Sequence, residues 1–284
     1  MTVHAEVIGD PISHSKSPLI HNYWIGKLGL DAHYERCHVM PDALADYFGS
    51  RRDRPDWQGC NVTIPHKQAV ISYLDRIDPS AAQIGAVNTI VRAHDGTLVG
   101  YNSDGAGFLE PLRPWLVDHH LLRMARIIGS GGAARALAHA LRGEGFTVAM
   151  IARDEEKARV ILDEIGEKNP GMSATLQSWS APIAFDWGDT EGRLDIVVNA
   201  TSLGMKGNPP LAIDFSHVPP HAIVYDIVYA PLETPLIAEA RRRGLRTIDG
   251  LEMLVGQAAV AFALFFGQPA PRQHDAELRA LLTA

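Results

Sequence analysis

Short apolar, β-branched stretches alternate with helical stretches over the first hundred residues. This alternation is typical of an α/β layer structure. The predicted strands are residues 5–9, 32–39, 59–64, 88–92 and 97–101, and the predicted helical segments are residues 18–28, 68–74 and 79–84. The helix at 18–28 has clear end signals, since Ser17 is expected as its N-cap, Pro18 as its first residue and Gly29 as its C-terminal stop.

A second pattern begins near residue 125 and is complete in itself. Its elements form one βαβ unit with a Gly-rich turn, and they are a strand at 126–128, the turn at 129–132, a helix at 133–142 ended by 143–145, and a strand at 147–151. Asp154 is expected to cap the helix that follows. Nearly all-apolar segments at 195–199 and 223–226 predict further parallel strands, buried on both faces.

The composition argues against several classes of protein, namely nucleic-acid-binding, disulfide-rich, metal-binding and membrane-spanning proteins. A formal net charge of −7 argues against sequence-independent nucleic-acid binding, which requires many phosphates to be neutralised. The two cysteines, Cys37 and Cys60, cannot form a disulfide framework, and no cluster has metal-ligand spacing. The N-terminal residues carry no export signal, and the apolar run at 253–266 is too short to cross a bilayer and is expected to be a buried helix. A cytoplasmic protein without a metal or membrane partner is expected.

The Gly-rich turn predicts dinucleotide binding. Gly129, Gly131 and Ala134 fit the G-x-G-x-x-G/A fingerprint, and their lack of large side chains lets the backbone approach a pyrophosphate at a helix N-terminus. NAD-binding versions place an acidic residue at the end of the second strand, where this chain has Ala152 and Arg153. A guanidinium suits a 2′-phosphate, so NADP is predicted. Two alternatives remain open, in which Arg153 is only a solvated strand-end residue or Asp154 is the ribose ligand.

Four polar segments of the first hundred residues lie at predicted strand ends or before helices. They are HSKSP at 14–18, NVTIPHK at 61–67, AVNT at 86–89 and YNSDG at 101–105. Ligands of open α/β sheets bind at the carboxyl ends of strands, so these segments are expected to converge on one site. Each residue taken singly also has an ordinary explanation as a cap, a turn former or an exposed lysine.

These four segments, in this order, resemble the shikimate dehydrogenase family. Three later segments resemble it as well, namely NATSLGM at 199–205, VYDIVYAPLETPL at 224–236 and DGLEMLVGQA at 249–258. The similarity extends from about residue 8 to about residue 265. It implies an N-terminal α/β substrate domain, residues 1–104 with 250–284, and a Rossmann-type NADP-binding domain, residues 105–249, with a cleft between them.

The resemblance also implies roles for individual residues. Ser15, Ser17 and Tyr229 would hold the substrate carboxylate, and Thr63, Asn88 and Gln257 would meet the ring hydroxyls. Lys67 and Asp104 would be the acid/base pair at the carbon that is oxidised, which fits a reaction that moves a proton as well as a hydride. The cofactor-binding residues would be Gly129, Ser130, Gly131, Gly132 and Ala133 at the pyrophosphate, Arg153 at the 2′-phosphate, and Ile227, Gly250 and Met253 at the nicotinamide.

Met253 is equally well explained as helix core. Three positions depart from the common pattern of the family. Ala152 stands where an Asn often precedes the Arg, Ser103 replaces a frequent Thr, and Glu252 lies where Gly is common.

The function implied is reversible, NADP-dependent reduction of 3-dehydroshikimate to shikimate, in the chorismate branch of aromatic amino acid biosynthesis. The alternatives are a paralogue acting on quinate or aminoshikimate, with NAD as a further cofactor choice, and a non-catalytic metabolite-binding module. The Lys67 and Asp104 pair argues against the module, which needs no acid/base group. A monomer or a homodimer is expected.

Overall fold

The structure is a computed structural model that describes residues 2–166 and 171–284. The chain forms two compact units, the first comprising Met1–Gly107 and Val255–Ala284, and the second comprising Phe108–Leu254. The chain passes between the units within two helices, α4 (Asp104–Leu109) and α10 (Gly250–Phe266).

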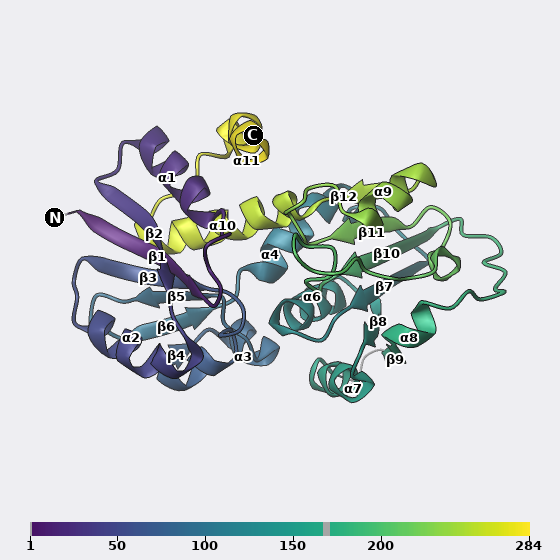
Figure 1. The fold of residues 1–284 in the computed structure, drawn as a ribbon, viewed down its shortest axis with the longest axis horizontal. Coiled ribbons are helices and arrows are strands. Elements are labelled where there is room, and N and C mark those ends of the chain that lie inside the picture. Colours follow the sequence, from purple (N-terminus) through teal and green to yellow (C-terminus); the bar gives the residue numbers. More distant parts are fainter. Residues whose placement is uncertain (1, 167–170) are drawn as a thin grey trace. The chain divides into compact units, whose positions relative to one another are not determined.

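The first unit is built on a mixed six-stranded sheet in the order β2-β1-β3-β5-β6-β4 (Figure 1). The strands are β1 (Val3–Gly9), β2 (Ala32–His38), β3 (Trp57–Val62), β4 (Arg76–Ile77), β5 (Thr89–Arg92) and β6 (Leu98–Tyr101). Strand β1 runs parallel to β2 and β3, whereas β5 runs antiparallel to both β3 and β6. The helical segments of this unit are α1 (Ser17–Leu28), η1 (Pro41–Ala43), α2 (Leu44–Arg52), η2 (Ala69–Tyr73), α3 (Pro79–Ile84), η5 (Arg272–His274) and α11 (Asp275–Thr283).

The second unit has a six-stranded parallel sheet in the order β12-β11-β10-β7-β8-β9 (Figure 1). The strands are β7 (Leu122–Ile128), β8 (Thr147–Ala152), β9 (Met172–Thr175), β10 (Arg193–Asn199), β11 (Ile223–Asp226) and β12 (Arg246–Ile248). The helical segments are η3 (Glu110–Leu112), α5 (Arg113–Leu116), α6 (Gly132–Gly143), α7 (Glu155–Glu164), α8 (Leu176–Trp179), η4 (Phe215–His217) and α9 (Pro235–Arg242). This is the strand order of a Rossmann fold, in which successive strands are added outward on one side from β7 to β9 and on the other side from β10 to β12.

Two apolar cores, one on each face of the parallel sheet, explain the nearly continuous apolar strands of the second unit. In β10, Ile196 and Val198 belong to one core, while Val197 between them belongs to the other. Successive side chains of a strand point to opposite faces, so a strand covered on both faces is apolar at every position. The two-domain α/β prediction with a Rossmann-type second domain is confirmed.

Helix α1 corrects the predicted N-cap. Ser17 is the first helical residue and Lys16 is the N-cap, so Ser17 does not cap the helix. The physical reason is that the Lys16 carbonyl already accepts hydrogen bonds from the Leu19 and Ile20 amides at 3.1 and 3.2 Å, so the helix begins one residue earlier, and the Ser15 hydroxyl accepts from the Ser17 amide at 3.3 Å. The end signal was right, because Gly29 follows the helix in the left-handed conformation at φ 62°.

Other differences concern element ends and short edge strands. The segment predicted as helical at 68–74 forms the 3₁₀ turn η2, and α10 begins at Gly250, three residues before its apolar run. The Asp249 carboxylate accepts a hydrogen bond of 3.1 Å from the Leu251 amide and so supports this earlier start. Helices α2, α8, α9 and α11 were not predicted. The edge strands β4, β9 and β12 were also missed, because short edge strands carry little apolar pattern. No helix in the described part of the chain is long and apolar enough to cross a membrane.

Candidate functional site

Lys67 and Asp104 form an ion pair in the first unit. Lys67 follows β3 in the NVTIPHK segment, and Asp104 is the first residue of α4. The Lys67 ammonium donates to Asp104 Oδ2, and Asn88 Nδ2 donates to the other carboxylate oxygen at 2.8 Å. The Lys67 side chain is 15% exposed and that of Asp104 is 6% exposed. A nearly buried carboxylate held on both oxygens therefore orients the ammonium group of a lysine side chain that is only partly buried.

Asn88 connects this pair to the next polar segment. Its amide donates to the Ser103 hydroxyl at 3.0 Å, and its carbonyl oxygen accepts from the Ser103 amide at 2.8 Å. Ser103 also donates to Gln257 Oε1 at 3.4 Å. Asn88 thus positions Asp104 within the protein, and any contact with a substrate hydroxyl would be additional to that role.

Gln257 reaches this group because α4 and α10 approach closely. A Cβ atom built on Gly107 would lie 2.3 Å from the Gln257 backbone nitrogen, so a glycine is needed there. Ser103 and Asn102 were not predicted as site residues. The Asn102 carboxamide accepts from the Asp104 amide at 3.0 Å and holds the start of α4. The clustered Asn, Ser and Asp of YNSDG, residues that favour helix starts, were the available sequence signal.

The loop carrying Ser15 and Ser17 is held by two cationic side chains. Arg36 donates from Nε and Nη2 to the Ser15 carbonyl oxygen at 2.9 and 2.6 Å. The Lys16 ammonium donates to the carbonyl of Leu282 in α11. Ser17 is buried and Ser15 is half-buried, as is Thr63, which lies directly after β3. The structure therefore places all three predicted substrate residues in the first unit, Ser15 and Ser17 at the start of α1 and Thr63 directly after β3.

The Gly-rich turn has the geometry of a phosphate cradle. A Cβ on Gly129 would meet the Ala200 carbonyl oxygen at 2.8 Å, and the φ of Gly129 is 129°, so the turn itself requires this glycine. A Cβ on Gly131 would meet nothing within 4 Å, so the fold does not require that one. Gly131 is exposed and is the N-cap of α6, where no side chain caps the helix amides. Open space over uncapped amides is what an anionic group needs. Ser130, Gly132 and Ala133 are half-buried in the same turn.

Arg153 is exposed directly after β8, and Ala152 is the last residue of that strand. Asp154 is the N-cap of α7, as predicted, and its carboxylate accepts from the Lys157 amide at 3.3 Å. This cap gives Asp154 a structural role and weakens its interpretation as a ribose ligand.

The residues predicted at the nicotinamide end belong to the second unit. A Cβ on Gly250 would lie 2.4 Å from the Ile227 carbonyl oxygen and 2.5 Å from that of Val228. Met253 is 6% exposed and belongs to an apolar core against which the half-buried Ile227 packs. The protein's own packing therefore explains both Gly250 and Met253, whatever they contact in addition. Tyr229, also of this unit, is half-buried.

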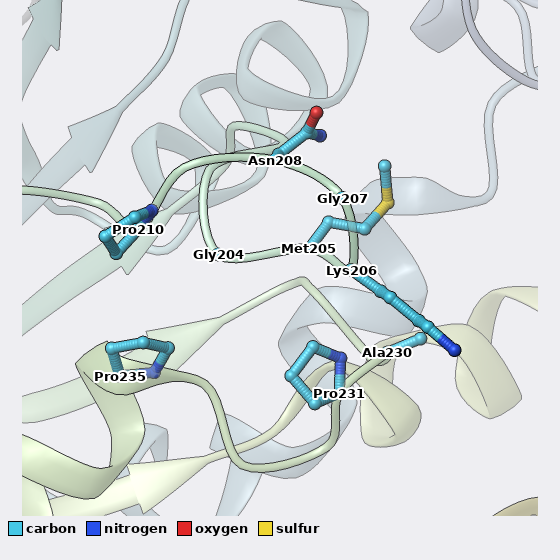
Figure 2. Close-up of a pocket in the computed structure, with 9 residues that line it drawn as sticks. All are labelled: Gly204, Met205, Lys206, Gly207, Asn208, Pro210, Ala230, Pro231 and Pro235. Atoms are coloured by element: carbon cyan, nitrogen blue, oxygen red, sulfur yellow. The ribbon is translucent and has the colours of Figure 1, made fainter.

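The loops that follow β10 and β11 border a hollow of about 460 Å³. Figure 2 shows the residues that line it. Its lining residues are Gly204, Met205, Lys206, Gly207, Asn208, Pro210, Ala230, Pro231 and Pro235. None of the predicted site residues lines it, although Ala230 directly follows Tyr229. The predicted site is thus distinct from this hollow. Within residues 2–166 and 171–284, no group of three or more His, Cys, Asp or Glu side chains is arranged to hold a metal ion.

Two family models match the chain. Residues 7–90 match the shikimate dehydrogenase substrate binding domain, which includes Ser15, Ser17, Thr63, Lys67 and Asn88. Residues 250–277 match the shikimate 5′-dehydrogenase C-terminal domain.

Comparisons over the full length agree with these matches. A protein of Sphingopyxis alaskensis named shikimate dehydrogenase (NADP(+)) is 50% identical over 99% of this chain and 97% of its own length. The crystal structure of shikimate 5-dehydrogenase from Thermus thermophilus in complex with NADP(H) and shikimate is 32% identical, covers 99% of both chains and has a TM-score of 0.83. Quinate dehydrogenase from Corynebacterium glutamicum in complex with NAD is 29% identical, covers 99% of both chains and has a TM-score of 0.82.

Proposed function

The chain belongs to the shikimate dehydrogenase family, and from this premise we propose that it catalyses the reversible NADP-dependent reduction of 3-dehydroshikimate to shikimate. The family membership predicted from seven sequence motifs is confirmed. The observation that carries the proposal is the Lys67 and Asp104 ion pair, which provides an oriented proton donor in the unit that contains the matched substrate-binding domain.

The proton chemistry is assigned to Lys67. In ketone reduction its ammonium donates a proton to the substrate carbonyl oxygen, and in alcohol oxidation its amine accepts the hydroxyl proton. Asp104 holds the Lys67 Nζ atom in place through the ion pair, and Asn88 holds Asp104. The buried carboxylate keeps the proton donor at one position, which contributes orientation to catalysis.

The substrate is a cyclic hydroxy acid, and the loops of the first unit suit it. The hydroxyls of Ser15 and Ser17, together with Tyr229, bind the carboxylate, because hydroxyls donate to an anion without adding a competing charge. Thr63, Asn88 and Gln257 bind the ring hydroxyls. Arg36 supports the carboxylate site indirectly, because its guanidinium donates two hydrogen bonds to the Ser15 carbonyl and so holds the Ser15 backbone in place.

The second unit fits a dinucleotide. Residues Gly129, Ser130, Gly131, Gly132 and Ala133 hold the pyrophosphate, supported by the open space at Gly131 and the uncapped start of α6. Arg153 binds the 2′-phosphate, supported by its exposure directly after β8. Ile227, Gly250 and Met253 border the nicotinamide. Bound NADP would accept or supply the hydride.

Quinate is the competing substrate, because a quinate dehydrogenase shares this fold at a TM-score of 0.82. Fold similarity alone does not select between two ring acids that differ by a hydroxyl and a double bond. A non-catalytic module is disfavoured by the Lys67 and Asp104 pair, which such a protein does not need.

The proposed location is the cytoplasm, supported by the two cysteines, Cys37 and Cys60, which are both free thiols. The proposed assembly state is a monomer or a homodimer.

The function is tested by following NADPH absorbance with purified protein and NADP⁺, with shikimate or quinate as substrate. We expect a kcat/KM for shikimate well above that for quinate. A higher value for quinate would reassign the substrate, and no turnover of either acid would refute the proposal.

A further inference from the structure

A buried polar group joins the loops that follow β10 and β11 in the second unit. Asn199 is the last residue of β10 and Asp226 the last of β11, and these two residues are partners in the strand register. Thr234 is the N-cap of α9, at the end of the loop that follows β11. Asn199 and Asp226 are 0% exposed and Thr234 is 1% exposed. The mechanism proposed above uses none of the three.

Three neutral donors satisfy the Asp226 carboxylate. Oδ1 accepts from Asn199 Nδ2 at 2.9 Å and from the Val228 amide at 3.0 Å, and Oδ2 accepts from the Thr234 hydroxyl at 2.6 Å. Burial raises the pKa of the Asp226 carboxyl, and these hydrogen bonds oppose the rise. A buried carboxylate without a cationic partner in the described residues is costly for a fold, so its presence calls for a role.

The hydrogen bonds converge on the backbone of residues 227 and 228. The Ile227 amide donates to the Asn199 carbonyl at 3.1 Å, and the Val228 amide donates to Asp226. On the other side, the carbonyls of both residues lie against Gly250, where a Cβ would come within 2.5 Å of each oxygen. The amides of residues 227 and 228 are therefore held by hydrogen bonds, their carbonyls pack against Gly250, and Tyr229 follows them directly.

We infer that Asp226 is a positioning residue that orients the backbone of residues 227–229, and thereby sets Ile227 at the nicotinamide and Tyr229 at the substrate carboxylate. This inference rests on the proposed function, which gives Ile227 and Tyr229 those roles. Asp226 itself is 0% exposed and acts through the hydrogen bonds to Val228 and Asn199.

Asn199 explains why the carboxylate cannot simply be removed. Its amide group also donates to the Leu203 carbonyl at 3.0 Å, and its oxygen accepts from the Thr201 amide and hydroxyl at 3.0 and 2.7 Å. Asn199 therefore uses its full hydrogen-bonding capacity. Asp226→Ala would leave donors of Asn199, Val228 and Thr234 without a partner. Asp226→Asn can keep all three contacts, with its oxygen accepting two hydrogen bonds and its amide donating to Thr234 Oγ1.

The test compares three variants of the full-length protein at a temperature at which circular dichroism shows each one folded. For Asp226→Ala we expect kcat to fall about 10²-fold, the scale of a small misplacement of reacting groups. The KM for shikimate should rise roughly tenfold, as for the loss of one good hydrogen bond. Binding of adenosine 2′,5′-bisphosphate, measured by calorimetry, should not change, because that ligand occupies the adenosine end only.

Two variants separate positioning from general destabilisation. Asp226→Asn should recover most of the lost kcat. Asp195→Asn is the matched control, because Asp195 is a buried carboxylate of β10 in the same sheet but is paired with Arg126 at 2.6 Å and Arg193 at 3.3 Å. It should lower the melting temperature and leave kcat and KM unchanged. If Asp226→Ala does not fold, Thr234→Val takes its place, because it removes one donor to the carboxylate. It should also lower kcat and raise the KM for shikimate, by smaller factors, and leave binding of adenosine 2′,5′-bisphosphate unchanged.

Equal kinetic losses in Asp226→Ala and Asp195→Asn would overturn the inference, as would an Asp226→Ala variant with unchanged KM and kcat. Amide hydrogen exchange gives a readout that does not depend on turnover. The Val228 amide should exchange at least tenfold faster in Asp226→Ala than in Asp195→Asn, about the effect of losing one hydrogen bond. If the unmodified protein turns over neither shikimate nor quinate, the proposed function fails. Equal amide hydrogen exchange at Val228 in Asp226→Ala and Asp195→Asn would separately refute the positioning role.

Discussion

His21 gives the sharpest test of the structure of the first unit. It lies in α1 and is 0% exposed, and its ring stacks on that of Tyr34 with centroids 4.0 Å apart. The rings of Phe262 and Phe265 also lie beside the His21 ring, with centroids 5.9 and 6.1 Å away. Neither ring nitrogen has a hydrogen-bond partner in the described residues. His21→Phe therefore replaces an imidazole in an aromatic cluster by a ring of similar shape and removes one buried titratable group.

The magnitude follows from the pKa of His21, which burial lowers from 6.5 to about 3. Because the unfolded chain binds this proton and the folded chain does not, the free energy of unfolding falls as the pH drops from 6.5 towards 3. At pH 5 the pH lies about 1.5 units below the unfolded-state pKa, and each unit corresponds to about 1.4 kcal/mol. His21 thus lowers stability by roughly 2 kcal/mol at pH 5 and by little at pH 7.

The assay is urea unfolding of the unmodified protein and of His21→Phe at pH 5 and pH 7. From pH 7 to pH 5, the free energy of unfolding of the unmodified protein should fall by roughly 2 kcal/mol more than that of His21→Phe. A packing cost of the larger ring, about 1–3 kcal/mol, would be the same at both pH values and would cancel. His94→Phe is the control, since His94 lies on the exposed turn between β5 and β6 and its imidazole contacts water whether the chain is folded or not.

A stability difference that is the same at pH 5 and pH 7 would refute the reasoning. So would an NMR signal of the His21 ring that titrates near pH 6.5, because a neutral, buried imidazole should keep one chemical shift down to about pH 4.

Three further predictions concern the site and its packing. Lys67→Ala and Asp104→Asn should each lower kcat by about 10² or more, the scale of acid/base catalysis, with smaller effects on substrate affinity, and steady-state turnover near normal in Lys67→Ala would exclude the mechanism. Arg153→Ala should raise the KM for NADP by about 10-fold to 100-fold, the worth of one charged hydrogen bond, and leave the KM for NAD nearly unchanged. Equal kcat/KM for the two cofactors in the unmodified protein would contradict that role for Arg153. Gly107→Ala should destabilise the protein by about 1–3 kcal/mol or more, because its methyl group would meet the Gln257 backbone at 2.3 Å, and an unchanged melting temperature would show that α4 and α10 do not approach so closely.

The local parts of the structure were predictable because they depend on neighbouring residues. The βαβ unit around residues 126–151 follows from apolar strands, a run of strong helix formers and glycines at the turn. Asp154 caps α7 and Gly29 ends α1, as their residue types indicate. The Ser17 cap failed within the same short range, because the helix begins one residue earlier, with the Lys16 carbonyl accepting from the Leu19 and Ile20 amides, and the residue types do not fix that start.

Tertiary structure decided which polar residues act on one another. Asn88 and Asp104 are 16 residues apart and Ser103 and Gln257 are 154 apart, so only the packing of β5, α4 and α10 brings each pair together. Hydrogen-bond partners over such separations depend on the register of strands and the crossing of helices. No local pattern of apolar and polar residues encodes these.

The same reason hid Asp226 from sequence reasoning. Asp226 and Asn199 end two segments that the sequence predicts as buried parallel strands, but neither segment by itself shows that the two polar side chains meet. Parallel pairing of β10 and β11 places the two residues in register, and both are buried, so the Asp226 carboxylate becomes the centre of a hydrogen-bonded group. The apolar pattern of one strand predicts its burial, but the partners of a buried polar side chain depend on which neighbouring strand and loops are placed beside it, and only the assembled sheet decides that.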